Sequence, residues 1–126
     1  MSEWTDLVCT VFGIEKIKSE YEKVMWDAAL QSKMFHWVVR KEGKVVSAVS
    51  TLIEGDAVSF WNGASLPEIR RQGLSTALRR FALQHAVARG CRVGTSYLMS
   101  EGLAYGICRQ LGYETKWRFN VFLSNQ

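Results

Sequence analysis

The stretch from Ala57 to Met99 constrains the fold of this chain more than any other part of its sequence. It begins with β-forming residues up to Trp61, changes to a helical period after Gly73, and returns to β-forming residues at Cys91. The residues expected on the inner face of the helix are Leu74, Ala77, Leu78, Phe81, His85 and Ala88, with Arg79 and Arg80 elsewhere. Gly90 stands where a helix is commonly capped. Two strands joined through a helix require a crossover, so we expect them to pair in parallel.

The rest of the sequence predicts two further helices, an antiparallel hairpin and a terminal strand. Apolar residues recur every three or four positions between Ile14 and Leu30, which indicates an amphipathic helix. Met34 to Arg40 and Val45 to Ile53 are rich in β-formers on either side of a polar turn, which predicts a hairpin. A short helix is expected around Ala104 to Leu111, and an alternating strand from Trp117 to Leu123. The predicted class is α/β (α+β), with a mixed antiparallel and parallel sheet flanked by helices.

The composition of the chain limits the class of protein to which it can belong. With 126 residues and 48% apolar composition the chain can bury one core, so we expect a single domain over residues 1–126. No apolar run approaches the roughly 20 residues of a membrane-spanning helix, and the N-terminus lacks the features of a signal peptide, so a soluble cytoplasmic protein is expected. Cys9, Cys91 and Cys108 are too widely spaced to indicate a disulfide framework or a zinc site.

The loop that opens the helix after Gly73 is suited to hold a phosphate group. The first amides of a helix have no intrahelical acceptor, and the helix dipole places partial positive charge beside them. Gly73 has no side chain to keep an anion away, and Ser75 and Thr76 add hydroxyl groups. Arg70 and Arg71 add positive charge at the rim. The same residues also fit an ordinary turn in which Ser75 caps the helix.

Two segments resemble the signatures of the Gcn5-related N-acetyltransferases (GNAT family). The first is "SLPEIRRQGLSTALRRFALQHA", and the second, downstream in the family's order, is "RGCRVGTSYLMSEGLAYGICRQLGY". The resemblance covers roughly Phe35 to Tyr113. It implies a GNAT-like fold with the first strand and one terminal strand missing. It also implies an N-acyltransferase that uses acetyl-CoA or another acyl-CoA as cosubstrate and a primary amine as acceptor, with direct attack in a ternary complex.

The resemblance also implies where the cofactor binds. The backbone of Gly63, Ala64 and Ser65 would hydrogen-bond the pantetheine arm of coenzyme A like an additional strand. The amides that would hold the pyrophosphate belong to Arg71, Gln72, Gly73, Leu74, Ser75 and Thr76. Glu101 takes a position where relatives often carry an Asn that contacts the cofactor.

The catalytic residues depart from the family's pattern. Many relatives have a Tyr that protonates the departing thiolate, and this chain has Cys108 at that position. Cys108 is a candidate general acid, because a thiol ionises at a pKa of about 8.5, but it also fits a small buried core residue. Tyr105, one turn earlier, is the substitute candidate. Ser96 stands where some relatives carry a Glu that acts as the general base, so Glu54 becomes the candidate base. Glu54 also fits a solvated turn residue.

Other expectations concern the surroundings of the site. His36 and His85 are expected to be structural, and Trp61 to shape an acceptor pocket. The shortened ends predict an uncovered sheet edge or face, and hence a homodimer or a docked partner, through the terminal strand Lys116 to Leu123. A non-catalytic acyl-CoA-binding module is the alternative to an enzyme. The interpretation as a nucleic-acid binder is supported only by the net charge of +4. The basic residues are scattered along the chain and form no long run.

Overall fold

The computed structural model describes residues 2–31, 33–98, 102–118, 120 and 122. Two helices come first, α1 (Ser2–Phe12) and α2 (Lys18–Leu30), with the 3₁₀ turn η1 (Glu15–Ile17) between them. Three strands follow, β1 (Met34–Lys41), β2 (Lys44–Glu54) and β3 (Ala57–Ser65). The chain then forms the 3₁₀ turn η2 (Pro67–Ile69), α3 (Leu74–Ala88), β4 (Val93–Ser96) and α4 (Leu103–Gln110).

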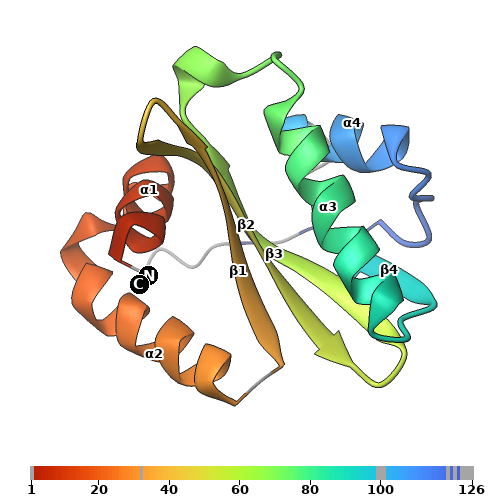
Figure 1. Cartoon of the computed structure of the whole chain (residues 1–126). Helices are drawn as coiled ribbons and strands as arrows, with labels where there is room; N and C mark the ends of the chain where they lie inside the picture. Colours follow the sequence, from red (N-terminus) through yellow and green to blue (C-terminus); the bar gives the residue numbers. More distant parts are fainter. Residues whose placement is uncertain (1, 32, 99–101, 119, 121, 123–126) are drawn as a thin grey trace.

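The strands form one mixed sheet in the order β1-β2-β3-β4. The first three are antiparallel neighbours, whereas β3 and β4 are parallel and are joined through α3. Helices α1 and α2 cover one face of the sheet, and α3 and α4 lie on the other (Figure 1). The predicted hairpin, crossover and mixed α/β class are therefore confirmed.

Strand β3 is paired on both sides over only part of its length. Its first four residues, Ala57 to Phe60, pair with Val93 to Ser96 of β4. Beyond them, from Trp61 to Ser65, β3 pairs with β2 alone among the described strands. Within this stretch the register shifts, and Asn62 adopts a left-handed φ of 55°. Such a bulge bends a strand locally, so β3 turns away from β4 where their pairing ends.

Each face of the sheet carries its own hydrophobic cluster. On the α1 face the cluster consists of Trp4, Leu7, Val8, Val45, Ala48 and Ala64. On the α3 face the main cluster consists of Val49, Phe60, Leu78, Ala82 and Cys108, and a smaller one consists of Val58, Ala86 and Cys91. A fully buried side chain of this kind contributes about 1.5–3 kcal/mol of hydrophobic stabilisation. These clusters therefore hold helices on both faces of β2 and β3.

The N-terminal part contains a helix that the sequence analysis did not predict. Helix α1 buries Trp4, Leu7 and Val8 against the sheet, at the spacing of three and four that indicates an amphipathic helix. The helix predicted from Ile14 begins instead as η1 and becomes α-helical at Lys18. Helix α2 has no fully buried residue, because it lies over α1 and the edge strand β1 rather than over the sheet centre.

Two further predictions need correction. The buried residues of α3 are Leu78, Arg79, Ala82 and Ala86, whereas Phe81, expected on the inner face, is 59% exposed. The inner face is thus rotated so that Arg79 enters the core. The predicted terminal strand is not seen among the described residues: 117, 118, 120 and 122 form no strand, and 119, 121 and 123 lie outside the described residues. A homodimer through Lys116 to Leu123 stays a prediction.

Candidate active site

The loop before α3 is fixed by its own hydrogen bonds. The Arg70 guanidinium donates to the Ser65 carbonyl oxygen at 3.0 Å, and Gln72 donates to the Glu68 carbonyl oxygen at 3.4 Å. Lys41 of β1 donates to the Gln72 side-chain oxygen at 3.2 Å. These bonds tie the loop to the ends of β3 and β1, so the start of α3 is held in place.

The start of α3 presents free backbone amides to solvent. Its N-cap, Gly73, has a φ of 77°, and no side chain caps the helix. A Cβ added to Gly73 would meet nothing within 4 Å, so the space in front of the amides is open. Arg71, two residues earlier, also has a positive φ of 66°. A helix end with uncapped amides and an adjacent arginine is suited to bind an anion such as a phosphate.

The unpaired edge of β3 leads away from this anion site. The stretch from Trp61 to Ser65 spans roughly 13 Å at about 3.3 Å per residue. On the side of β4 its backbone groups have no strand partner among the described residues. An extended ligand could pair with this edge, from the loop at Ser65 to the last β3–β4 pair at Phe60 and Ser96. We call the point where the two strands separate, after Phe60 and Ser96, the fork.

A buried arginine lies at the fork. Arg79 of α3 is only 4% exposed, and its guanidinium carbon lies 5.0 Å from the centre of the Phe60 ring. A Cβ on Gly63 would collide with the Arg79 guanidinium, so this glycine lets the arginine reach the strand backbone. The Arg79 guanidinium shares a hydrogen bond with the Cys108 side chain, whereas its Nε atom has no partner among the described residues. Burial lowers the pKa of Arg79, but a guanidinium keeps its proton in proteins.

Two further titratable side chains surround Arg79. Cys108 of α4 is 1% exposed, and burial raises the pKa of its thiol, while Arg79 opposes that rise. Burial raises the pKa of Tyr113 to about 12. The Tyr113 ring stacks on Phe60 at 6.0 Å, and its hydroxyl lies where a Cβ on Gly94 would be. The fork is therefore bordered by a cation and two neutral acids.

Comparison with known families and proteins identifies the family of this chain. A family model described as an acetyltransferase (GNAT) domain matches residues 10–98. The chain belongs to the GNAT acetyltransferase family. Among curated proteins, none matches the sequence closely enough to count as a relative.

Solved structures of GNAT acetyltransferases share the fold. AAC(6')-Iy, bound to a bisubstrate analogue of CoA and acetylneamine, is 15% identical, with a TM-score of 0.80 over 98% of this chain and 90% of that chain. AAC(6')-IG from Acinetobacter haemolyticus is 15% identical, with a TM-score of 0.78 over 98% and 91%. An acetyltransferase from Clostridium acetobutylicum with acetyl-CoA is 12% identical, with a TM-score of 0.77 over 95% and 87%. At this identity the likeness establishes the fold alone.

The structure separates the predicted catalytic residues of this GNAT chain. Cys108 lies at the fork, whereas the Tyr105 hydroxyl faces Thr115 at 2.9 Å and Arg118 at 3.4 Å. The hydrogen bond from Thr115 lowers the pKa of Tyr105. Glu54 pairs with Ala57, three residues before Phe60 at the fork, or roughly 10 Å away along the strand. Glu54 is 3.7 Å from Lys33, and both side chains are exposed. The structure does not bring Glu54 to the fork.

The cofactor residues predicted from the family resemblance lie along one path, which runs from the start of α3 along the unpaired edge of β3 to the fork. Gly63, Ala64 and Ser65 are on the unpaired part of β3, and residues 71–76 form the loop and first turn of α3. Glu101 lies outside the described residues. Arg79 and Tyr113 were missed. The small residues Ala82 and Ala86, three and seven positions after Arg79, were the signal that Arg79 shares the packed face of α3.

The two histidines are held in the scaffold. Ser50 of β2 and the Met25 carbonyl oxygen of α2 lie 2.6 Å and 3.2 Å from the two ring nitrogens of His36. Since a carbonyl can only accept, Nε2 of His36 donates to it, and in the neutral imidazole Nδ1 accepts from the Ser50 hydroxyl. Burial lowers the pKa of His36. His85 packs its ring against Phe35 and Trp37 at 4.7 Å and 4.8 Å.

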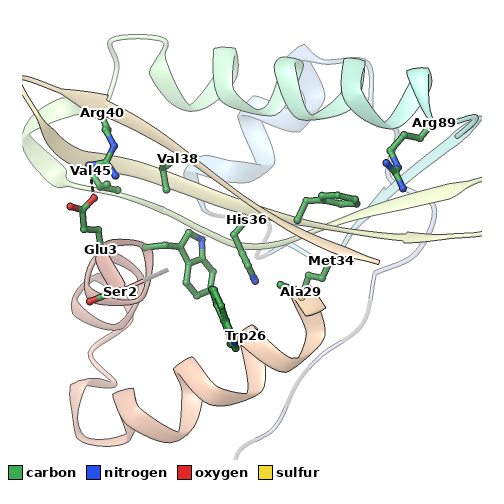
Figure 2. Close-up of a pocket in the computed structure, with 12 residues that line it drawn as sticks. Ser2, Glu3, Trp26, Ala29, Met34, His36, Val38, Arg40, Val45 and Arg89 are labelled. Atoms are coloured by element: carbon green, nitrogen blue, oxygen red, sulfur yellow. Dashed lines mark ion pairs between the residues drawn. The ribbon is translucent and has the colours of Figure 1, made fainter. Parts of the chain in front are cut away.

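A separate cavity of about 690 Å³ opens along the edge strand β1. Figure 2 shows His36 pointing from β1 toward α2, with Trp26 on the opposite wall. Glu3 of α1 forms an ion pair with Arg40 of β1 at one end. Because β1 is two strands away from β3 in the sheet, this cavity is distinct from the fork.

Proposed function

We propose that this GNAT protein transfers an acetyl or short acyl group from acyl-CoA to a primary amine by direct attack in a ternary complex. The observation that carries the proposal is the unpaired edge of β3, which runs from the uncapped start of α3 to the fork. Acetyl-CoA as cosubstrate agrees with neighbours of the same fold that contain acetyl-CoA or a CoA analogue.

Coenzyme A fits this path in one direction. Its pyrophosphate is the anion suited to the amides of residues 71–76, with Arg71 adding charge. Its pantetheine arm carries amide groups that can pair with the backbone of Gly63, Ala64 and Ser65 as an added strand. The thioester then lies at the fork, where the path between β3 and β4 ends.

The proposed reaction depends on orientation and on charge. An amine nitrogen attacks the thioester carbonyl carbon while backbone amides of the bulged part of β3 polarise the carbonyl oxygen. The carbon–nitrogen bond forms, the carbon–sulfur bond breaks, and CoA leaves as a thiolate. The proton released from the nitrogen passes to water.

The acceptor is expected to approach from the α1–α2 face. Trp61 lies at the fork with 41% of its surface exposed, and its ring is 6.3 Å from that of Tyr97 beyond β4. Such an aromatic pair suits the apolar face of a sugar or a ring-bearing amine. The structural neighbours include aminoglycoside acetyltransferases and a glucosamine-6-phosphate N-acetyltransferase from Arabidopsis thaliana. Amino sugars are therefore the first acceptor class to test.

Calorimetry with acetyl-CoA and a thiol-release assay test this proposal in two steps. We expect acetyl-CoA to bind at submillimolar concentration, and amino sugars to release free thiol from it faster than buffer does. The absence of binding at that concentration would refute both the enzyme and the binding module.

A non-catalytic acyl-CoA-binding module is the second candidate. It is favoured by the buried Cys108, whose raised pKa makes the thiol a weaker proton donor, and by the position of Glu54 away from the fork. Tight binding of acetyl-CoA without thiol release, across aminoglycosides, hexosamine phosphates, polyamines and peptides, would favour the module over the enzyme.

A further inference from the structure

Arg79 is a buried cation that no described acidic side chain neutralises. The four ion pairs among the described residues do not include it, and its charged neighbours are limited to the groups that ionise at Cys108 and Tyr113. Its Nε donor has no acceptor among the described residues, although Arg79 is only 4% exposed. A buried guanidinium that has one neutral thiol partner, no carboxylate and an unsatisfied Nε is unfavourable in the free protein. A negative charge that arrives from outside would offset that cost.

The position of Arg79 shows where such a charge would have to be. Arg79 is five residues after Leu74, or roughly 7.5 Å along α3 from the proposed pyrophosphate site. Its guanidinium lies against the Cα of Gly63 and over the ring of Phe60, the last β3 residue that pairs with β4. The guanidinium is therefore at the far end of the path along β3, at the fork.

We propose that Arg79 is a catalytic residue that stabilises the CoA thiolate as it leaves the thioester. This inference rests on the proposed function, because that function places the sulfur at the fork. When the amine nitrogen bonds to the carbonyl carbon, the electron pair of the carbon–sulfur bond moves to sulfur. The full negative charge on sulfur then lies beside a cation in a water-poor site, where their attraction is stronger than in water.

Arg79 makes a proton donor unnecessary for the leaving group. Cys108 and Tyr113 are the titratable groups that face the guanidinium from α4 and the segment after it, and β3 contributes the uncharged Phe60 and Gly63. Burial raises the pKa of both the Cys108 thiol and the Tyr113 hydroxyl, so both stay neutral. The departing sulfur is stabilised by charge rather than by transfer of a proton.

The affinity of free CoA as a function of pH tests this inference on the intact protein. A cation beside the sulfur lowers the pKa of the bound thiol, so binding releases a proton and tightens as the pH rises toward the pKa of the free thiol. Desulfo-CoA lacks the sulfur and serves as the reference, because all other ionisations are shared. We expect the CoA preference, the Kd of desulfo-CoA divided by that of CoA, to increase about tenfold from pH 6.5 to pH 9.

Variants at two adjacent arginines sharpen the test. Arg79→Met should remove the pH-dependent increase and lower kcat about 100-fold to 1000-fold, with the KM for acetyl-CoA changed less than about threefold. Arg79→Lys, which keeps a positive charge, should retain part of both effects. Arg80→Met is the matched control, because Arg80 is the next residue of the same helix and is exposed. It should behave like the wild type.

The outcomes separate this inference from the proposed function. If CoA binds but its preference over desulfo-CoA is independent of pH, or if Arg79→Met keeps the increase, Arg79 does not face the thiolate and the inference is wrong. The proposed function survives that result. If neither CoA nor desulfo-CoA binds, both fail. If Arg79→Met does not fold, the pH dependence of the wild type and of Arg79→Lys still decides the matter.

Discussion

His36 and Arg79 are polar, titratable side chains packed on opposite faces of the same sheet, and their surroundings differ. Both ring nitrogens of His36 have partners, one from β2 and one from α2. Arg79 is more deeply buried and carries a charge, yet its Nε has no partner. Buried polar groups in folded proteins are normally hydrogen-bonded. The satisfied His36 therefore has a structural role, whereas the unsatisfied Nε of the charged Arg79 supports the proposal of a ligand on the α3 face.

Charge, and not only the missing partner, distinguishes the two faces. The Trp4 indole nitrogen and the Tyr21 hydroxyl on the α1–α2 face also lack partners. Both are neutral, and burial raises the pKa of Tyr21 to about 12. A neutral unpaired group costs less than an unpaired guanidinium. The α1–α2 face therefore needs no bound anion.

The largest effect is expected from a negative charge at the start of α3. Gly73→Glu should weaken acetyl-CoA binding at least about 100-fold, or about 2.7 kcal/mol, because the new carboxylate repels the pyrophosphate and blocks the amides. Gly90→Glu is the matched control: Gly90 also has a positive φ and open space around it, but follows the other end of α3. Calorimetry should show normal affinity for Gly90→Glu. Equal losses in both variants would mean that backbone strain, not the site, is responsible.

A methyl group at Gly63 should disturb Arg79 directly. The Cβ of Gly63→Ala would collide with the guanidinium, so we expect a loss of about 1–3 kcal/mol in the free energy of unfolding, together with reduced turnover. Gly106→Ala in α4 is the control, because its Cβ meets nothing within 4 Å and helical alanine is favourable by up to about 1 kcal/mol. Urea unfolding measures both. A neutral Gly63→Ala would show that Arg79 is loosely held.

Removal of His36 should affect stability but not ligand affinity. His36→Ala leaves Ser50 and the Met25 carbonyl oxygen without their partner, which costs about 1–2 kcal/mol in the free energy of unfolding. The Kd for acetyl-CoA should remain within about twofold of the wild type, because His36 belongs to β1, which is separated from β3 by β2. If the affinity falls by more than the loss of stability can explain, His36 takes part in ligand binding and its role is not only structural.

The smallest effect is the pH dependence of stability. His36 has a lowered pKa in the folded protein, so the unfolded chain binds more protons below its own pKa of about 6.5. The free energy of unfolding should therefore fall as the pH falls from about 6.5 toward the folded pKa of His36, and rise again when the pH is raised. The His36→Ala variant should show a flatter profile in the same range. If the slope of stability against pH is the same in the variant and the wild type, a group other than His36 causes the pH dependence.

The sequence was sufficient for strands β1 to β4 and for the loop before α3, because both depend on local signals. Gly73 and the change of period predict the β3–α3 crossover without any knowledge of packing. Arg79 could not be recognised in the same way, since a charged residue is normally assigned to the solvent side of a helix. Only the rotation of α3, fixed by Leu78 and Ala82 against β2 and β3, turns Arg79 inward.

The catalytic residues show the same limit. Glu54 and Cys108 were paired as base and acid from their places in the chain, but the structure puts Glu54 beside Lys33 at the other end of β3. Helix α1 was also missed, although Trp4, Leu7 and Val8 have helical spacing. Local periodicity thus predicts elements, whereas the neighbours of a side chain depend on how distant elements pack.

Residue-resolved hydrogen exchange with and without acetyl-CoA tests the central claim most directly. We expect slower exchange at the amides of Gly63 to Ser65 and of Leu74 to Thr76, which are the β3 edge and the start of α3. Amides around the β1 cavity, such as those of His36 and Val38, should not change. Protection at the β1 cavity, with none along β3, would contradict the account.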